Sequence, residues 1–284
     1  MSLNTYLRLD FVKPGYVGYI SVYKASILEA ITTFGSISAA ARVTKVKPQN
    51  LRRMAHEINE DFGEIIASKR GRSGGALVTA KGLALLQQFR TIEESVRRAV
   101  AEDLRKIEKL IGSDPQMPRP WFEYDRWRQL QPARLKMLNP VRAVRVPAAD
   151  STPLSVHVYL GLFSEKLWIG EGYIILLRAI EKYGSIGSAA RATSWDYYNV
   201  RHKVKQMNQI PGGIVVTQRG RGGGATLSPR GVELTDRFCE IRHGIHRKLS
   251  RELAFAAHLA NGDNPGRNLY PDYAPLIRLR EELL

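Results

Sequence analysis

Two arginine- and glycine-rich stretches of the sequence are nearly identical, and their residue types suit the binding of anions. Residues 70–76 read RGRSGGA and residues 219–225 read RGRGGGA. The arginines are Arg70 and Arg72 in the first stretch, and Arg219 and Arg221 in the second. A guanidinium forms paired hydrogen bonds with phosphate or with a base edge, and glycine permits a tight turn. We expect thin loops that present cations to a polyanion, and ordinary solvated turns are the alternative.

A group of polar side chains precedes each stretch, in a segment whose apolar residues recur at helical spacing. Asparagine and glutamine can form two hydrogen bonds with adenine, and arginine can do so with guanine. The candidates in the first segment are Lys47, Gln49, Asn50, Arg52 and Arg53. The matching positions of the second segment hold Asp196, Tyr197, Tyr198, Asn199, Arg201, His202 and Lys203. Because Asn50 and Asn199 match, they are the best candidates for base contacts; for every residue, a phosphate contact or none is the alternative.

The composition favours a polyanionic partner. The chain has 284 residues, a formal net charge of +16 and 44% hydrophobic residues, which is typical of a globular protein with affinity for nucleic acid or an anionic surface. Cys239 is the only cysteine, so an intramolecular disulfide and a cysteine-based zinc site are excluded. The sequence has no apolar run near the ~18 residues of a membrane span and begins without a signal-peptide pattern. We therefore expect a cytoplasmic, nucleoid-associated protein.

The chain contains an internal duplication. Gly35 and Gly184 are 149 positions apart, and this offset continues without a gap from Leu7 and Val156 to Leu104 and Leu253. Within it, FGSISAAARVT at 34–44 aligns with YGSIGSAARAT at 183–193. The period is far longer than that of a solenoid, so the sequence predicts two copies of a domain. The predicted boundaries are 1–112 and 154–261 for the domains, 113–153 for a proline-rich linker and 262–284 for a C-terminal tail.

Each copy has the same expected order of elements. Alternating apolar residues near Leu7, and then Ile20 and Val22, predict two strands, followed by a helix that ends at Gly35. Ser36, and Ser185 in the second copy, are expected to cap a short helix and could instead meet a phosphate. A third helix from about Pro48, a glycine-rich hairpin and a long helix follow. The long helices are predicted at 81–111 and 230–259, and the fold class is mainly α with small β-hairpins.

These motifs resemble the DNA-binding domains of LysR-type and, more closely, ModE-type bacterial regulators. The resemblance rests on GSIS at 35–38, Asn59, GGALVT at 74–79 and Gly82, and it covers both copies but neither the linker nor the tail. It implies two winged helix-turn-helix domains, in which the third helix enters the major groove and the hairpin, or wing, follows the backbone or minor groove. The chain has no room for a molybdate-binding module or a LysR-type sensor, so we expect no molybdate and no other cofactor.

The function expected from these features is sequence-specific binding of double-stranded DNA by a transcription regulator. The two recognition helices differ, so one chain is expected to read two unlike half-sites as an intramolecular pseudo-dimer held by its long helices, with a homodimer of two chains as the competitor. An architectural DNA-binding protein is an alternative. A third possibility is that one winged domain binds a protein such as RNA polymerase, which the aromatic residues Trp195, Tyr197 and Tyr198 favour.

Enzymatic and metal-binding motifs are not evident. The glycines at 220–224 lack the Gly-Lys-Ser/Thr of a phosphate loop, and neither a nucleophile elbow nor a His-Glu-x-x-His motif is present. Cys239, His243 and His246 lie within two turns of one predicted helix, but no carboxylate motif completes a metal site. We expect no enzyme activity and no bound metal.

The wing arginines give the first testable prediction. Arg70→Ala and Arg219→Ala should each weaken binding to every DNA sequence, because a phosphate contact carries no sequence information. Each should also lower the slope of log affinity against log salt by about one. Titrations of two unrelated duplexes at several salt concentrations check this, and a loss confined to one sequence would contradict it.

Overall fold

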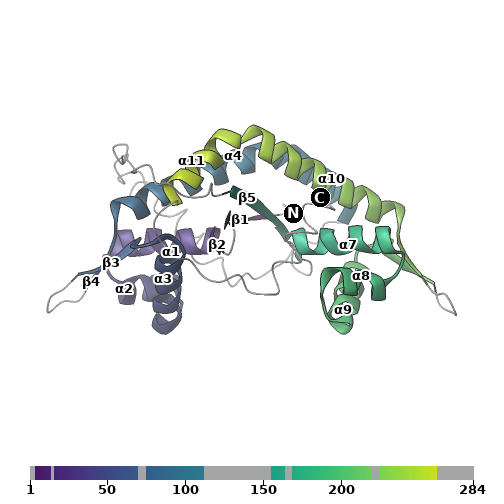
Figure 1. Ribbon diagram of the computed structural model, residues 1–284, viewed down its shortest axis with the longest axis horizontal. Coiled ribbons are helices and arrows are strands. Elements are labelled where there is room, and N and C mark those ends of the chain that lie inside the picture. Colours follow the sequence, from purple (N-terminus) through teal and green to yellow (C-terminus); the bar gives the residue numbers. More distant parts are fainter. Residues whose placement is uncertain are drawn as a thin grey trace.

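The computed structural model describes residues 4–13, 16–69, 75–111, 155–163, 168–218 and 224–260, and it is mainly helical with small antiparallel sheets (Figure 1). The predicted mainly α class is therefore confirmed. The predicted linker at 113–153 and tail at 262–284 lie outside the described residues. The same holds for the predicted wing arginines Arg70, Arg72, Arg219 and Arg221. Within the described residues, no helix combines the length and the apolarity needed to cross a membrane.

The two copies have the expected order of elements. The first contains β1 (Asn4–Lys13), β2 (Tyr16–Ser21), α1 (Val22–Phe34), α2 (Ile37–Thr44), α3 (Pro48–Phe62), β3 (Ile66–Lys69), β4 (Gly75–Val78) and α4 (Ala80–Ile111). The second contains β5 (Ser155–Phe163), β6 (Trp168–Gly170), α7 (Glu171–Tyr183), α8 (Ile186–Thr193), α9 (Tyr197–Met207), β7 (Val215–Thr217), β8 (Ala225–Leu227), α10 (Pro229–Lys248) and α11 (Ser250–Ala260).

Two details of the sequence prediction are wrong. Val22, expected in a strand, is the first residue of α1, because Ser21 caps that helix by accepting a hydrogen bond from the Lys24 backbone. The long helix expected at 230–259 is two helices that meet at Leu249, whose φ of −111° is far from the helical value. No glycine or proline lies at the break. Leu249 is instead buried, so packing rather than a helix-breaking residue accompanies the change of direction.

The turn before the second helix is built in the same way in both copies. Gly35 and Gly184 end α1 and α7 in the left-handed region, with φ of 67° and 70°, which glycine adopts without steric cost. The Ser36 hydroxyl accepts a hydrogen bond from the Ala39 N–H, and Ser185 does the same for Ser188. The predicted caps are thus confirmed, and they fix the angle between the first two helices.

A four-stranded sheet joins the two copies, with the strand order β2-β1-β5-β6. β1 and β5 pair antiparallel, and Leu9 lies opposite Val158, its own counterpart at the offset of 149. On either side the pairing is reciprocal: Leu7 faces Leu160, and Phe11 faces Val156. Because backbone hydrogen bonds form this junction, it does not require the two copies to carry identical side chains.

The long helices form a second junction between the copies. α4 contacts both α10 and α11, and the Gln88 side chain donates a hydrogen bond to the Glu252 carbonyl oxygen at 2.9 Å. Figure 1 shows α4 running alongside α10 and α11 in the opposite direction, while α3 and α9 both lie on the other side of the molecule. The two junctions therefore hold α3 and α9 in one fixed arrangement.

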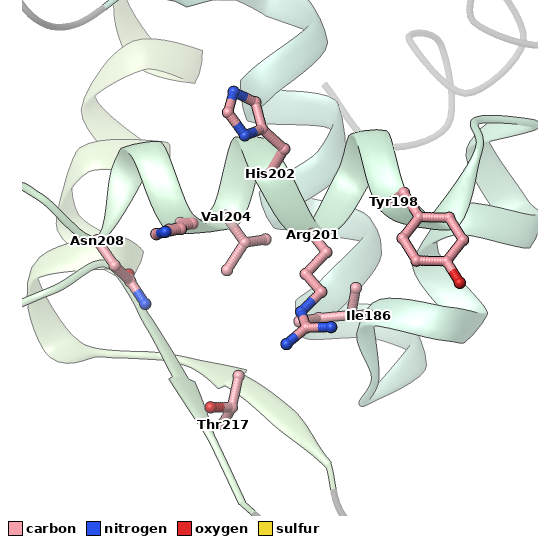
Figure 2. Close-up of a pocket in the computed structure, with 8 residues that line it drawn as sticks. Ile186, Tyr198, Arg201, His202, Val204, Asn208 and Thr217 are labelled. Atoms are coloured by element: carbon pink, nitrogen blue, oxygen red, sulfur yellow. The ribbon is translucent and has the colours of Figure 1, made fainter.

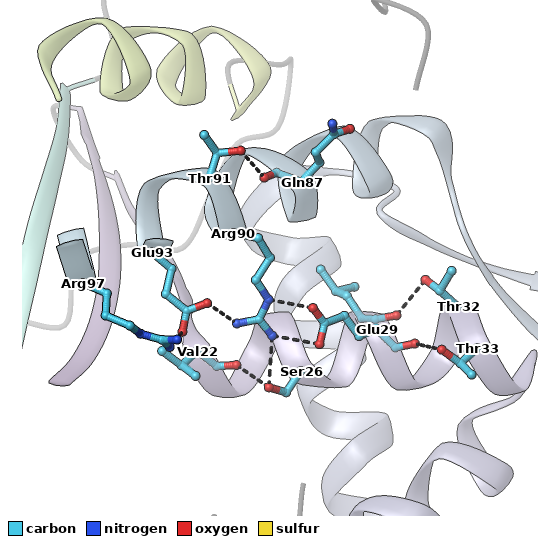
Figure 3. A network of polar contacts seen from close by, with 11 residues as sticks. Val22, Ser26, Glu29, Thr32, Thr33, Gln87, Arg90, Thr91, Glu93 and Arg97 are labelled. Atoms are coloured by element: carbon cyan, nitrogen blue, oxygen red, sulfur yellow. Dashed lines mark hydrogen bonds and ion pairs between the residues drawn. The ribbon is translucent and has the colours of Figure 1, made fainter. Parts of the chain in front are cut away.

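A buried ion-pair network fastens α1 to α4 (Figure 3). The Arg90 guanidinium lies 2.6 Å from Glu29 and 2.6 Å from Glu93, and it also donates to the Ser26 hydroxyl. Burial opposes the charge of Arg90, but the two carboxylates outweigh this effect and raise its pKa. Since all three charged groups are largely withdrawn from water, each depends on the others.

The second copy makes the equivalent contact with different residues. Arg178 stands where the first copy has Glu29, and it pairs with Asp236 of α10 at 2.7 Å. Cys239 replaces Arg90, and Arg242 of α10 lies 3.7 Å from Glu171 of α7. The duplication has therefore kept the position of the helices while exchanging the charges that hold them.

The Arg90 network predicts a large effect on stability. Arg90→Ala should lower the free energy of unfolding by about 3–5 kcal/mol, because it leaves the Glu29 and Glu93 carboxylates buried without their cation. Chemical denaturation measures the change. Arg98→Ala, which removes an exposed arginine of the same helix, is the matched control and should change stability by less than about 0.5 kcal/mol. Equal effects of the two substitutions would refute this role of Arg90.

Candidate nucleic-acid interface

Helices α3 and α9 each bury one face and present the other to solvent. Leu51, Ala55 and Ile58 of α3 are in the core. Their counterparts in α9, including Val200 and Val204, are buried in the same way. An amphipathic helix held by one stripe leaves the opposite stripe free for contacts.

The exposed face of α3 is polar and mostly basic. Its residues are spaced i, i+3, i+4 and i+7, and they are Gln49, Arg52, Arg53 and His56. Lys47 and Asn50 are also exposed, at the start of the helix. Two side chains of this face have acidic partners in the next turn: Arg53 lies 3.0 Å from Glu57, and His56 lies 3.2 Å from Glu60. Arg53 and His56 therefore share their N–H groups with carboxylates, whereas Arg52 has no acidic partner among the described residues.

The exposed face of α9 uses the same four positions but different chemistry. They hold Tyr198, Arg201, His202 and Lys205. Asn199 is exposed beside them. In the part of the chain that the structure describes, no acidic group pairs with Arg201, His202 or Lys205, so the cations of this face are available to an anionic partner.

Lys203 does not belong to this exposed face, although the sequence grouped it with the other candidates. Its ammonium lies 4.4 Å from the centre of the Tyr173 ring and 5.3 Å from that of Trp195. Burial lowers the pKa of Lys203, and the aromatic faces provide partial compensation for its charge. We assign Lys203 to the packing of α9 against α7 rather than to contacts with a ligand.

The two helices begin differently. Lys47 stands at the N-cap of α3 and makes no side-chain cap hydrogen bond. At the matching position, the Asp196 carboxylate accepts hydrogen bonds from the N–H groups of Tyr198 and Asn199 at 2.9 and 3.1 Å. The start of α3 is thus positively charged, whereas that of α9 carries a carboxylate that offsets the helix dipole.

An asparagine clamp positions each hairpin. The Asn59 side-chain oxygen accepts hydrogen bonds from the N–H groups of Ile65 and Ile66, and its amide donates to the Ile66 carbonyl. Asn208 makes the same three bonds to Ile214 and Val215. Asn59 belongs to the sequence motif on which the resemblance to ModE-type domains rests. Its role here is to tie the end of α3 to the strand that follows.

In each copy, one glycine at the start of the long helix allows that helix to lie close to the hairpin. A Cβ at Gly82 would lie 2.7 Å from the Ile65 carbonyl oxygen, and one at Gly231 would collide with the carbonyl of Ile214. Any larger residue would therefore push α4 or α10 away from the strand. This close approach explains why the two glycines match in the sequence.

An open hollow of about 500 Å³ lies between α8, α9 and β7 (Figure 2). Apolar side chains and the Tyr198 ring line it together with cationic groups: Ile186, Tyr198, Arg201, His202, Val204, Lys205, Asn208 and Thr217. Figure 2 shows the Arg201 side chain pointing from α9 toward Ile186 and the strand of Thr217. The hollow can accept a group that is partly apolar and partly anionic.

His56 and Lys205 are two exposed basic residues that the sequence candidates omitted. The signal was available, because they continue the spacing of i, i+3, i+4 and i+7 from Gln49 and Tyr198.

Cys239 is buried, which raises the pKa of its thiol, and it accepts a weak contact from Arg178 at 3.9 Å. Among the described residues, no group of three metal-binding side chains is present.

Comparisons with protein-family models, curated proteins and solved structures found no significant match for this chain.

The asparagine clamp predicts a local effect on the hairpin. Asn59→Ala removes three hydrogen bonds and should lower stability by about 1–3 kcal/mol. Exchange of the Ile65 and Ile66 amide hydrogens should become faster, because both lose their acceptor. Hydrogen exchange read by NMR measures this. Asn50→Ala, which alters an exposed asparagine of the same helix, should leave both amides protected, and unchanged protection in Asn59→Ala would contradict the clamp.

Proposed function

We propose that the protein is a sequence-specific double-stranded DNA-binding regulator of transcription, with each copy acting as a winged helix-turn-helix domain. The observation that carries this proposal is that α3 and α9 each have an exposed polar face, and both helices lie on the same side of the molecule (Figure 1). An α-helix fits the major groove, and donors on its free face can reach base edges and phosphates. The resemblance of both copies to ModE-type DNA-binding domains supports the same assignment.

The two junctions between the copies support an intramolecular pseudo-dimer. Leu9 opposite Val158 relates the copies reciprocally, as equivalent residues are related across the axis of a dimer. The contacts of α4 with α10 and α11 supply the long-helix interface within one chain. A single chain then carries both recognition helices, and a second chain is not required for a bipartite site.

The half-sites are expected to be unlike. Lys47 corresponds to Asp196 and Gln49 to Tyr198, so the first turns of α3 and α9 offer different groups to the groove. Asn50 and Asn199 are common to both and can each read adenine. A non-palindromic sequence with adenine in each half is the site that fits these residues.

The exposed pair Tyr197 and Tyr198 favours a second candidate function, in which the second domain binds a protein such as RNA polymerase. Their rings are in edge contact, with centres 5.8 Å apart, and Tyr198 is 75% exposed. Aromatic side chains at a surface are common anchors of protein interfaces. This candidate predicts that α9 contributes nothing to the DNA site.

The DNA-binding proposal is tested by selection of bound duplexes from a random pool at physiological salt. We expect a bipartite, non-palindromic motif whose halves are about one helical turn apart. A palindrome would contradict the pseudo-dimer, since it requires two identical halves. Binding without any enriched motif that fades steeply with salt would replace the regulator by an architectural DNA-binding protein.

Two substitutions, one in α3 and one in α9, separate base reading from phosphate binding. Asn50→Ala should cost about 1–3 kcal/mol on the selected site and relax the preference at one base pair, because it removes a bidentate contact. Arg201→Ala of α9 should instead weaken all sequences and reduce the salt slope, since its side chain turns toward the wing side of the helix. Binding titrations with single-base variants of the site measure both. A uniform loss for Asn50→Ala would rule out base reading by that residue.

A further inference from the structure

Tyr198 is the most exposed large apolar side chain of the described residues, and it stands on the face of α9 that we assign to the major groove. Its exposed fraction is 75%, compared with 45% for Tyr197. The Tyr197 ring is also exposed and contacts the Tyr198 ring, so the two form an aromatic surface that a partner can bury with a gain in free energy. Tyr198 and Arg201 both line the hollow between α8, α9 and β7 (Figure 2).

The surroundings of Tyr198 fix its position before any ligand arrives. The Asp196 carboxylate holds the Tyr198 N–H at 2.9 Å, and the Tyr197 ring supports the Tyr198 ring by an edge contact. A backbone and a ring that are already ordered lose little conformational entropy on binding. The same carboxylate repels phosphate, so the first turn of α9 suits the uncharged edge of a base better than the DNA backbone.

The cations of the same face lie one and two turns further along α9. Arg201 and Lys205 line the hollow between α8, α9 and β7, together with the apolar side chains of Ile186 and Val204. Phosphates attracted to Arg201 and Lys205 would orient the duplex with its base edges next to the first turn of the helix. In this orientation Tyr198 contacts the base edges of the major groove, and Arg201 and Lys205 contact the phosphates that border it.

In a B-form duplex the bases are stacked, so a side chain in the major groove meets only their edges. The C5 methyl of thymine is the apolar group that these edges display. Apart from the smaller C5–H of cytosine, the other major-groove positions present hydrogen-bond donors or acceptors, against which a ring face would leave polar atoms unsatisfied. The chemical complement of Tyr198 is therefore a thymine methyl.

Resting on the proposed DNA-binding function, we propose that Tyr198 is a specificity-determining residue that reads a thymine in the second half-site through contact between its ring and the C5 methyl. The matching residue of α3 is Gln49, whose amide reads hydrogen-bonding groups instead. The duplication thus pairs an amide reader in one half with a methyl reader in the other, which makes the site directional.

The experiment removes single methyl groups from the DNA. In the duplex recovered by selection, each thymidine is replaced in turn by deoxyuridine, which differs from thymidine only by the C5 methyl. At one thymine, or two adjacent ones, of a single half-site, the affinity of the wild-type protein should fall about fourfold, the effect of exposing one methyl-sized apolar group. Binding is measured by fluorescence anisotropy at physiological salt.

Three variants assign the effect to the ring. Tyr198→Ala should bind the thymine and deoxyuridine duplexes equally well. Tyr198→Phe should keep the fourfold difference, because it retains the ring and loses only the hydroxyl. Gln49→Ala, the matched substitution in the first copy, should weaken binding but keep the difference. Tyr198 is exposed, so its replacement leaves the core intact.

Several outcomes would overturn the inference while leaving the proposed function standing. They are insensitivity of every thymine to deoxyuridine, a difference that persists in Tyr198→Ala, and a difference that disappears in Tyr198→Phe. Full DNA affinity in Tyr198→Ala would also overturn it and would point to a protein partner for the ring. Failure of the proposed function is a separate result, because the selection would then yield no motif at all.

Discussion

The antiparallel pairing of β1 with β5 is the interaction on which the rest of the molecule depends. Leu9 and Val158 are buried at its centre, and backbone hydrogen bonds run between the copies on both sides of them. The pairing joins what would otherwise be an edge strand of each copy, and an unpaired edge is prone to aggregation. It also fixes the relation of α1 to α7, and the contacts of α4 with α10 and α11 complete the same junction. The position of α3 and α9 on the same side of the molecule follows from it.

A backbone junction leaves the side chains of each copy free to diverge. The contact between the first helix and the long helix uses Arg90 and Glu29 in one copy, and Arg178 and Asp236 in the other. The exposed faces of α3 and α9 have diverged further, because no core packing restricts them. The turn glycines, the capping serines and the asparagine clamp have not changed, since each meets a requirement of the backbone. The proposed directional reading of DNA uses this division between a fixed frame and variable faces.

Much of this structure could be predicted from the sequence, because it depends on local signals. The offset between Gly35 and Gly184 reveals the duplication, Ser36 marks a helix start, and apolar spacing separates the buried from the exposed face of α3. The pairing of β1 with β5 was not predicted, since neither strand carries a signal that names its partner across the intervening residues. The break at Leu249 has no glycine or proline to announce it. The sequence grouped Lys203 with the exposed candidates. Its burial could not be predicted, because the aromatic neighbour Tyr173 comes from another helix.

The central claim is that one chain presents both recognition helices to one duplex. Sedimentation of the protein with a duplex that carries the selected bipartite site tests it most directly, because the mass of the complex gives the number of chains bound. One chain per duplex, with both halves protected from nuclease, is the expected result. Two chains per duplex, or a single chain that protects only one half, would show that the copies do not act together on one site.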